Sequence, residues 1–505
     1  MASSRPPCTV LRGNRSSMTN SRRDSPPIKG QLSSLSGRPR RYSCLAVNGQ
    51  QQNSRFLALL IAAIVLAVPS LASAGGFWLP GHGATPLGRG GAVVASSDDP
   101  NGIWYNPATL VRNKGNQLLI DVAMIDLSAD FTRADRQARD GSTVTYETVK
   151  NEGMPQWIPQ LLFSSDLGTD EFALAVGAYA PNAPRYRFPE DGPQRYSIVD
   201  NTESLILYEH LAFAWRPHPR FAVGAGIQNM MAVLDSTFMG SSYVGLWGEP
   251  EDYDLDLMIH IKATDLLTIT GNFGVWGEPV DGLTLGASVQ APAAVQDDEA
   301  KLEVRLPSHY AFDNASVDGD KMVLSIDLPW IFRAGVGYGV EHVFDVELDV
   351  VYETWSVHQA IHSDPKSVNV RNVPTVGSLE VGALNVQRDF QNTLGVGLGG
   401  EYTVVPEMLD LRAGFMFEQG AIPDKTFSLF QVDSQKFAPT LGASLSFADF
   451  SVDLAYSFIY QVSRDITTSE VAQVNPTYDA GSTIVGNGST SSFFNVLAMG
   501  ARYAF

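Results

Sequence analysis

The sequence has 505 residues, a formal net charge of −19 and 44% hydrophobic residues. Past residue 74 it contains no run of 18 apolar residues, which excludes a polytopic helical membrane protein. Residues 1–74 hold ten of the 35 basic residues but one of the 54 acidic residues, so the remaining chain carries a charge of −28. That charge excludes a nucleic-acid-binding protein. Both cysteines, Cys8 and Cys44, precede residue 74, which excludes disulfide and thiolate chemistry after it.

The first 74 residues are typical of an extension followed by an export signal. Residues 1–55 are rich in Ser, Arg and Pro, so we expect them to be disordered. Their length favours a misassigned start, with initiation near Val47. Residues 56–74, FLALLIAAIVLAVPSLASA, form an apolar run that ends in the small-residue pattern of a signal-peptide cleavage site. A retained membrane anchor is the alternative.

The next segment, residues 75–115, lacks the periodicity of a strand. It is rich in glycine and leads into SDDPNGIWYNPATL (97–110), which predicts a short helix over residues 99–110 with Ser97 or Asp98 as its N-cap. Irregular chain at membrane depth must be shielded from lipid. We therefore expect this segment to fold inside the lumen of a barrel, as an N-terminal hatch.

Residues 116–505 are dominated by alternation with a period of two. In FDVELDVVYE (344–353) apolar residues alternate with acidic ones, and SVDLAYSFIY (451–460) follows the same pattern. Such runs come in closely linked pairs, for example across residues 448–449, which indicates antiparallel hairpins. The stretches 356–390 and 461–492 are expected to be long polar loops.

A soluble β-sandwich would show the same alternation. Three features favour an all-β, antiparallel transmembrane barrel in the bacterial outer membrane: strands of about ten residues, short links that alternate with long ones, and aromatic residues at strand ends. Those aromatics include Tyr352 with Trp355 and Phe458 with Tyr460. The alternating last strand ends in Phe505, the kind of terminal aromatic that the barrel assembly machinery reads, so that machinery is an expected partner. A closed barrel also leaves no strand edge exposed to lipid.

Several short motifs carry a resemblance to a known family. They are Leu87-Gly88-Arg89-Gly90-Gly91-Ala92, then Asp98-Asp99, then Trp104-Tyr105-Asn106-Pro107-Ala108, with further matches in residues 270–292, 328–357 and 392–424. In this order they resemble the outer-membrane long-chain fatty acid transporter (FadL/OmpP1/TodX) family over the whole chain after the signal segment, least closely in residues 112–200. The resemblance implies a barrel of fourteen strands over residues 116–505, plugged by the hatch.

The same resemblance implies passive uptake of hydrophobic compounds. Long-chain fatty acids are the expected substrate, and aromatic hydrocarbons are the alternative. The ligand would enter at an outer groove, bind in an apolar lumenal pocket gated by the hatch, and leave sideways into the outer-membrane lipid. The family default is a monomer.

Three groups of residues are candidates for the transport path. The hatch or gate group comprises Asp98, Asp99, Trp104, Tyr105, Asn106, Pro107 and Ala108, for which a plug that only prevents leakage is the alternative role. The apolar ligand-binding group comprises Phe77, Trp78 and Leu79 beside the hatch and Met230, Met231 and Phe238 in an outer loop. A carboxylate ligand would need a cation, and the candidates are Arg89, Arg333 and Arg412. For each arginine we prefer the alternative of pairing with lumenal acids such as Asp345, Glu347, Asp349 and Asp410.

No cofactor, metal site or catalytic residue is expected. His358 and His362 have the spacing of metal ligands but fall in a loop, and the acidic run 251–256 favours a solvated loop over a calcium site. A lipid hydrolase would need a nucleophile with a neighbouring base, and the sequence has no Gly-x-Ser-x-Gly elbow. A general porin or adhesin would lack the hatch.

Overall fold

The computed structural model describes residues 82–138, 140–181, 185–373, 377–475 and 483–505. The extension, the signal segment and the candidate residues Phe77, Trp78 and Leu79 lie outside these ranges. Within them, no helix is long and apolar enough to cross a membrane.

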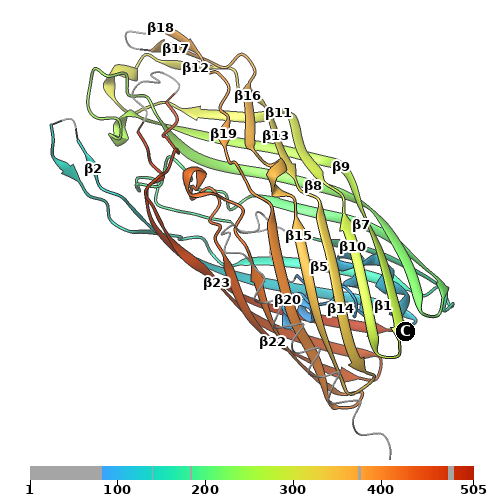
Figure 1. Cartoon of the computed structure of the whole chain (residues 1–505). Helices are drawn as coiled ribbons and strands as arrows, with labels where there is room; N and C mark the ends of the chain where they lie inside the picture. The colour runs from blue at the N-terminus through green and yellow to red at the C-terminus, as the bar shows by residue number, and fades with distance from the viewer. Residues whose placement is uncertain (1–81, 139, 182–184, 374–376, 476–482) are drawn as a thin grey trace, which may run out of the picture. The chain divides into compact units, whose positions relative to one another are not determined.

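A closed antiparallel barrel of fourteen strands makes up most of the described chain (Figure 1). The strands of the barrel wall are β1 (Asn116–Arg133), β5 (Gln156–Ser165), β6 (Phe172–Tyr179), β7 (Leu205–His218), β8 (Phe221–Ser241), β9 (Asp256–Val280), β10 (Leu283–Gln290), β14 (Ile331–Val340), β15 (Phe344–Glu353), β20 (Thr393–Val405), β21 (Leu409–Glu418), β22 (Lys436–Phe447), β23 (Phe450–Ile466) and β24 (Gly488–Ala504). The first and last strands pair from Gln117 opposite Ala504 to Arg133 opposite Gly488, which closes the wall. The predicted fold class is confirmed.

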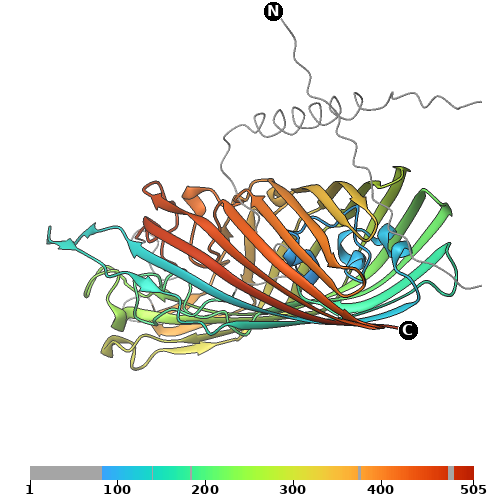
Figure 2. The same cartoon turned by 90° about the horizontal axis from the view of Figure 1, so that it is seen from below.

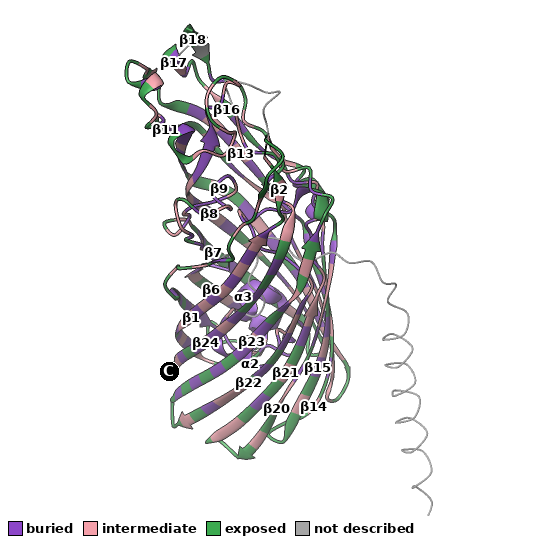
Figure 3. Cartoon of the chain, turned by 90° about the vertical axis from the view of Figure 1, so that its left-hand side faces the viewer, coloured by how far each residue is buried: buried purple, intermediate pink, exposed green. Residues whose placement is uncertain are grey.

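Alternation along each strand sorts the side chains onto the two faces of the wall, so exposed and buried residues alternate along the strands in Figure 3. On β15, Val346 and Val350 are exposed on the outer face, whereas Glu347 and Asp349 are buried in the lumen. An apolar outer face and a polar interior are what lipid around the barrel requires.

Trp355 does not join the expected aromatic girdle. It is fully buried in η4 (Trp355–Val357), because β15 ends at Glu353 and the indole donates to that carboxylate at 2.5 Å.

Several wall strands are interrupted and resume towards the upper end of the barrel in Figure 1. The resumed strands are β11 (Ala293–Arg305), β13 (Lys321–Leu328), β16 (Ala360–Pro365) and β19 (Val386–Gln387). They pair in the order β9, β11, β13, β16, β19. Two of the interruptions contain a proline, Pro292 and Pro329. Proline has no backbone N–H to donate to a neighbouring strand, so the strand pairing breaks there.

Short strands complete the outer end. They are β2 (Arg136–Gln137), β3 (Thr143–Val144), β4 (Val149–Lys150), β12 (Ser316–Asp318), β17 (Asn369–Val373) and β18 (Gly377–Glu380), with 3-10 turns η2 (Tyr253–Leu255), η3 (Tyr310–Phe312) and η5 (Asp424–Thr426). The expectation that 356–390 is one long loop is therefore wrong, because β16 to β19 lie within it.

The hatch lies inside the barrel, where α2 (Ala84–Gly88) and α3 (Gly102–Tyr105) are drawn within the ring of strands (Figures 2 and 3). The predicted single helix is two pieces, α3 and η1 (Pro107–Arg112), because Asn106 between them has extended backbone with φ −160°. The predicted N-cap is wrong as well. Asn101 precedes α3 without a side-chain cap, and Asp99 accepts a hydrogen bond from the backbone N–H of Asn101 at 2.9 Å.

Candidate functional site

Asn106 ties the hatch to itself and to the barrel wall. Its Oδ1 accepts from the backbone N–H of Ala108 at 3.1 Å and caps η1, while Nδ2 donates to the carbonyls of Val94 at 2.8 Å and Val275 at 3.0 Å. Pro107 occupies the first position of η1, where a missing N–H does no harm. A Cβ at Gly274 of β9 would collide with Asn106, so only glycine lets the hatch approach this closely.

A ladder of carboxylates on β15 holds the backbone of the hatch. Asp349 Oδ2 accepts from the backbone N–H groups of Val93 at 2.8 Å and Val94 at 3.0 Å, and Glu347 accepts from Ala95 at 2.6 Å. Charge-assisted bonds of this kind are among the stronger hydrogen bonds in proteins. The acidic face of β15 therefore docks the plug.

Two of the three arginine candidates are paired with lumenal acids. Arg89 contacts Asp345 at 2.5 Å, and Arg412 contacts Glu401 at 2.5 Å and Asp453 at 3.1 Å. Pairing with lumenal acids was the preferred alternative from the sequence, and Asp345 was named for it, whereas Glu401 and Asp453 were not. Their positive charge is already compensated, so neither arginine stands free for a ligand.

Arg333 differs from the other two. It is buried on β14, and the described residues place no carboxylate oxygen within 4.0 Å of it. Its Cζ lies 4.8 Å from the ring centre of Trp104, and its Nη1 has no hydrogen-bond partner. It lines a cavity of about 90 Å³ beside the hatch together with His82, Trp104 and Tyr105. The buried carboxyl groups of Glu353 and Asp349 line the same cavity, so Arg333 has acidic neighbours there without a direct ion pair.

Aromatic rings close the lumen around α3. The His82 ring stacks on Tyr105 and Tyr179, with ring centres 5.4 Å and 5.3 Å apart, and meets the edge of Trp104 at 5.5 Å. Burial, together with the charge of Arg333, lowers the pKa of His82 to about 3, so the imidazole is neutral at physiological pH. Sequence reasoning missed Tyr179 of β6, although its place on the inward face of an alternating strand was the available signal.

The remaining hatch candidates differ in their burial. Ala108 is fully buried in η1, and Asp99 is buried at 3% exposure, where it bonds to the side chain of Asn101 at 3.0 Å. Asp98 is exposed. The hatch candidates thus supply hydrogen bonds to the barrel wall and the aromatic side chains that pack around α3. Asp98 supplies neither.

A second cavity of about 430 Å³ lies at the outer end, between the upper parts of the strands and the loops. We call it the outer cavity. Apolar side chains dominate its lining, among them Ile206, Phe238, Ile261, Leu324, Ile326 and Ile361. Phe238 is thus part of it, but Met230 and Met231 are not among the lining residues. The expectation of an outer loop at 230–238 is wrong, because β8 continues to Ser241 paired with β9.

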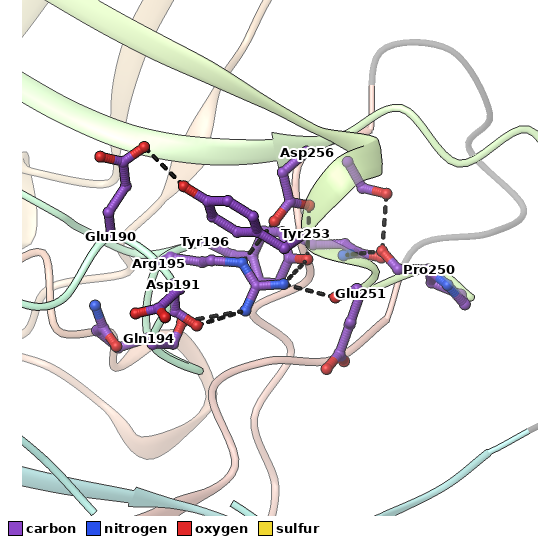
Figure 4. Close-up of polar contacts among 12 residues, drawn as sticks. Glu190, Asp191, Gln194, Arg195, Tyr196, Pro250, Glu251, Tyr253 and Asp256 are labelled. Atoms are coloured by element: carbon purple, nitrogen blue, oxygen red, sulfur yellow. Dashed lines mark hydrogen bonds and ion pairs between the residues drawn. The ribbon is translucent and has the colours of Figure 1, made fainter. Parts of the chain in front are cut away.

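Buried ion pairs clamp the outer loops above this cavity (Figure 4). Arg195 contacts Asp256 at 2.5 Å, and the hydroxyl of Tyr196, which lines the outer cavity, donates to Asp256 at 2.8 Å. Glu251 is held by Arg133 at 2.5 Å. Burial alone would raise the pKa of Glu251, but the charge of Arg133 holds it below its ordinary value. The run 251–256 is therefore not simply a solvated loop.

A third concavity, of about 580 Å³, opens on the barrel wall around β6. We call it the wall depression. β6 has eight residues and pairs with β5 only from Leu161 to Ser165. The lining combines the lipid-facing side chains of Leu161 and Val176 with the buried His210 and Gln228. The wall is therefore concave beside this short, partly paired strand.

A chain of side-chain contacts connects the wall depression with the hatch. His210 Nδ1 lies 2.7 Å from the hydroxyl of Tyr179, and its Nε2 lies 3.2 Å from Oδ1 of Asn272. Asn272 in turn donates to the carbonyl of Ile103 in the hatch at 2.8 Å. Movement of α3 would disturb the contacts that line the depression.

Across the part of the chain that the structure describes, no group of three or more His, Cys, Asp or Glu side chains is placed to hold a metal ion. His358 is buried behind Trp355, and His362 lies on β16.

A fourteen-stranded barrel with an apolar outer face and a plugged lumen defines the class of outer-membrane transport channels. The chain belongs to the outer membrane protein transport protein (OMPP1/FadL/TodX) family, whose sequence model matches residues 65–505. This confirms the resemblance and the outer-membrane location. Proteins of this kind are transport channels for hydrophobic compounds rather than enzymes.

Solved structures show the same fold at low sequence identity. A FadL homologue of Pseudomonas aeruginosa is 16% identical in sequence, with a TM-score of 0.67. The alignment covers 85% of this chain and 100% of the homologue. The toluene transporter TodX of P. putida is 16% identical with a TM-score of 0.61, covering 85% and 99%. The toluene transporter TbuX of Ralstonia pickettii is 15% identical with a TM-score of 0.56, covering 84% and 99%. A comparison with curated proteins finds no match.

Proposed function

We propose that the protein is a passive uptake channel for long-chain fatty acids, which bind in the outer cavity, pass the hatch and leave through the wall depression. The observation that carries this proposal is the apolar outer cavity of about 430 Å³ above a lumen that the hatch fills. Burying an acyl chain is favourable by roughly 0.8 kcal/mol per methylene. Binding therefore needs no energy source, and release into lipid is equally favourable.

The path from the outer cavity leads to the hatch. Arg333, beside Trp104, offers its unbonded Nη1 to a carboxylate that reaches this level, next to the buried Glu353 and Asp349 of the same cavity. The side chains that connect Ile103 through Asn272 and His210 to Tyr179 support a coupling between hatch movement and the wall depression. A lateral exit at β6 would spare the ligand a passage through the aqueous periplasmic end.

Uptake of aromatic hydrocarbons is the second candidate function. The rings of His82, Trp104 and Tyr105 around the small cavity beside the hatch favour a flat aromatic ligand at that position. The similar structures of TodX and TbuX are those of toluene transporters. The two candidates share the route and differ in whether a carboxylate is bound.

The test measures uptake of labelled oleate and of labelled toluene by cells that lack their own outer-membrane fatty acid transporter. The chain is expressed intact and as the double variant I206W/I326W, which fills the outer cavity from β7 and β13. The matched control is L398W, which adds the same indole to an exposed, lipid-facing position on β20.

We expect the intact chain and L398W to restore oleate uptake and the double variant to reduce it about tenfold. Toluene uptake without oleate uptake would replace the fatty-acid proposal with the second candidate. Equal uptake by the intact chain and the filled variant would show that the outer cavity is not on the path. Folding of each variant is checked by the heat-dependent gel mobility of the extracted barrel.

A further inference from the structure

A carboxyl group stands on the lipid-facing side of the barrel wall. Glu209 is exposed on the outward face of β7, where the exposed Leu205 and Leu211 lie on either side of it along the strand. Its direct partner on β8 is Asn229, which follows the exposed Ile227 on the same face. Apolar neighbours along both strands place this pair within the apolar band of the wall. An acidic side chain at membrane depth is unfavourable and usually marks a functional site.

The contacts of Glu209 leave its charge without a counter-charge. Its Oε2 accepts a hydrogen bond from Asn229 Nδ2 at 3.2 Å, and the same Nδ2 donates to the carbonyl of Leu266 at 3.3 Å. Among the described residues, no Lys, Arg or His side chain forms an ion pair with Glu209. Asn229 Oδ1 is buried and has no hydrogen-bond partner there. The pair therefore presents a negative charge and an unused acceptor oxygen.

Glu209 and Asn229 both line the wall depression. Glu209 pairs with Ala178 of β6, and Ala178 is also the partner of Leu161, where the pairing between β5 and β6 stops. The same depression is lined by the buried His210, which lies on the lumenal face of β7. Polar groups from both faces of the wall thus reach this one place.

A carboxylate at this place distinguishes the heads of amphiphiles by their charge. Like charges repel more strongly beside lipid than in water, because the local dielectric constant is lower. An anionic head is therefore disfavoured beside Glu209. An uncharged head with an O–H group can donate to the carboxylate or to the unused Oδ1 of Asn229. A fatty acid meets this condition once its carboxylate has taken a proton from hydronium, which leaves water.

We propose that Glu209 and Asn229 form a polar rim at the wall depression, which passes amphiphiles whose head is an uncharged hydrogen-bond donor and holds back anions. The inference rests on the proposed function, because it assigns the chemical selectivity of the lateral exit. It also gives a task to a carboxyl group at a depth where lipid offers it no favourable partner.

The test measures the initial uptake of labelled amphiphiles with one common tail by cells that lack their own outer-membrane fatty acid transporter. Oleyl alcohol has an uncharged donor head, oleyl sulfate has a permanent negative charge, and oleate tests the proposed function itself. E209Q removes the charge of the rim at nearly constant size, and E209D keeps it. The matched control is E341Q, which removes an exposed carboxylate in the turn between β14 and β15, outside the depression.

The intact chain is expected to take up oleyl alcohol at least about tenfold faster than oleyl sulfate, because only the sulfate is repelled at the rim. E209Q should raise oleyl sulfate uptake about fivefold or more and change oleyl alcohol uptake less than about twofold. E209D and E341Q should discriminate between the two ligands as the intact chain does. Each variant is first shown to fold by its heat-dependent gel mobility.

Equal uptake of oleyl alcohol and oleyl sulfate by the intact chain would overturn the rim, and this comparison needs no variant. An equal effect of E209Q on both ligands would also overturn it, since Glu209 would then affect only the shape of the wall. If the intact chain takes up neither oleate nor oleyl alcohol, the proposed function fails and the rim fails with it. Uptake of both without a selective effect of E209Q refutes the rim alone.

Discussion

At the scale of single residues, most of the hatch motif has a physical task. Asn106 is suited to its position because one amide group both caps η1 and reaches two carbonyls, one of them on β9. Trp104 places its ring against Arg333. These contacts support a seal at the level of α3, and His82 contributes a titratable ring to it.

His82 gives the seal a pH dependence. Its pKa is lowered to about 3 by burial and Arg333, against an ordinary value near 6.5, so the docked hatch binds fewer protons than the released one. The contribution of His82 to docking is therefore fully present above about pH 6.5, and it falls by up to ~1.4 kcal/mol for each pH unit of acidification towards pH 3. The rings of Tyr105 and Tyr179 also face His82, and burial raises the pKa of Tyr105, so that group stays neutral throughout this range.

We expect the conductance of the protein in planar bilayers to rise as the pH falls from 7 to 5. H82F should remove this rise, because phenylalanine keeps the ring and cannot be protonated. H342F, at an exposed histidine in the turn between β14 and β15, should retain it. An identical rise in H82F would assign the pH dependence to other groups.

At the scale of elements, close approach between the hatch and the wall depends on small residues and on the carboxylates of β15. Gly274 leaves room for Asn106, and Glu347 and Asp349 bind consecutive backbone N–H groups of the hatch. Elsewhere in the wall, β6 is short and has the wall depression beside it. The described barrel thus combines a docked plug with a concavity in its wall.

Filling the wall depression should separate binding from transport. We expect V176W, which adds an indole on β6, to lower oleate uptake about fivefold or more while leaving the affinity of the extracted protein for oleate within about twofold. The reason is that Val176 lines the depression and is absent from the lining of the outer cavity. L398W again serves as the control, and normal uptake by V176W would argue for an exit elsewhere.

At the scale of the whole barrel, ion pairs connect loops that are far apart in the sequence. Arg133 at the end of β1 holds Glu251. Arg195 from the loop before β7 holds Asp256 at the start of β9 (Figure 4). Both side chains of the second pair are at most 6% exposed. These contacts keep the outer loops together above the outer cavity.

Removing one partner should loosen the loops without unfolding the barrel. We expect R195A to leave Asp256 buried and uncompensated, which costs about 3–5 kcal/mol. Protease added to intact cells should then cut the loops between β6 and β9 faster, while the heat-dependent gel mobility of the barrel stays unchanged. R371A breaks an exposed pair worth about 0–1 kcal/mol and should show no such effect. Unchanged cleavage of R195A would show that the clamp is dispensable.

The sequence by itself determined the barrel. Alternation with a period of two separates lipid-facing from lumenal residues one by one, so β15 and β23 were recognisable from local patterns such as FDVELDVVYE. The turn at 448–449 followed from the same patterns, since hairpin links are local. The hatch was recognisable because its pattern differs from that of every strand around it.

Only the tertiary structure decided which side chains meet. Arg89, Arg333 and Arg412 look alike in the sequence, yet among the described residues two of them form ion pairs within 4.0 Å, whereas Arg333 only shares a cavity with Glu353 and Asp349. Strand periodicity depends on the chain itself, whereas the pairing of charges depends on which strands and loops the closed barrel brings together.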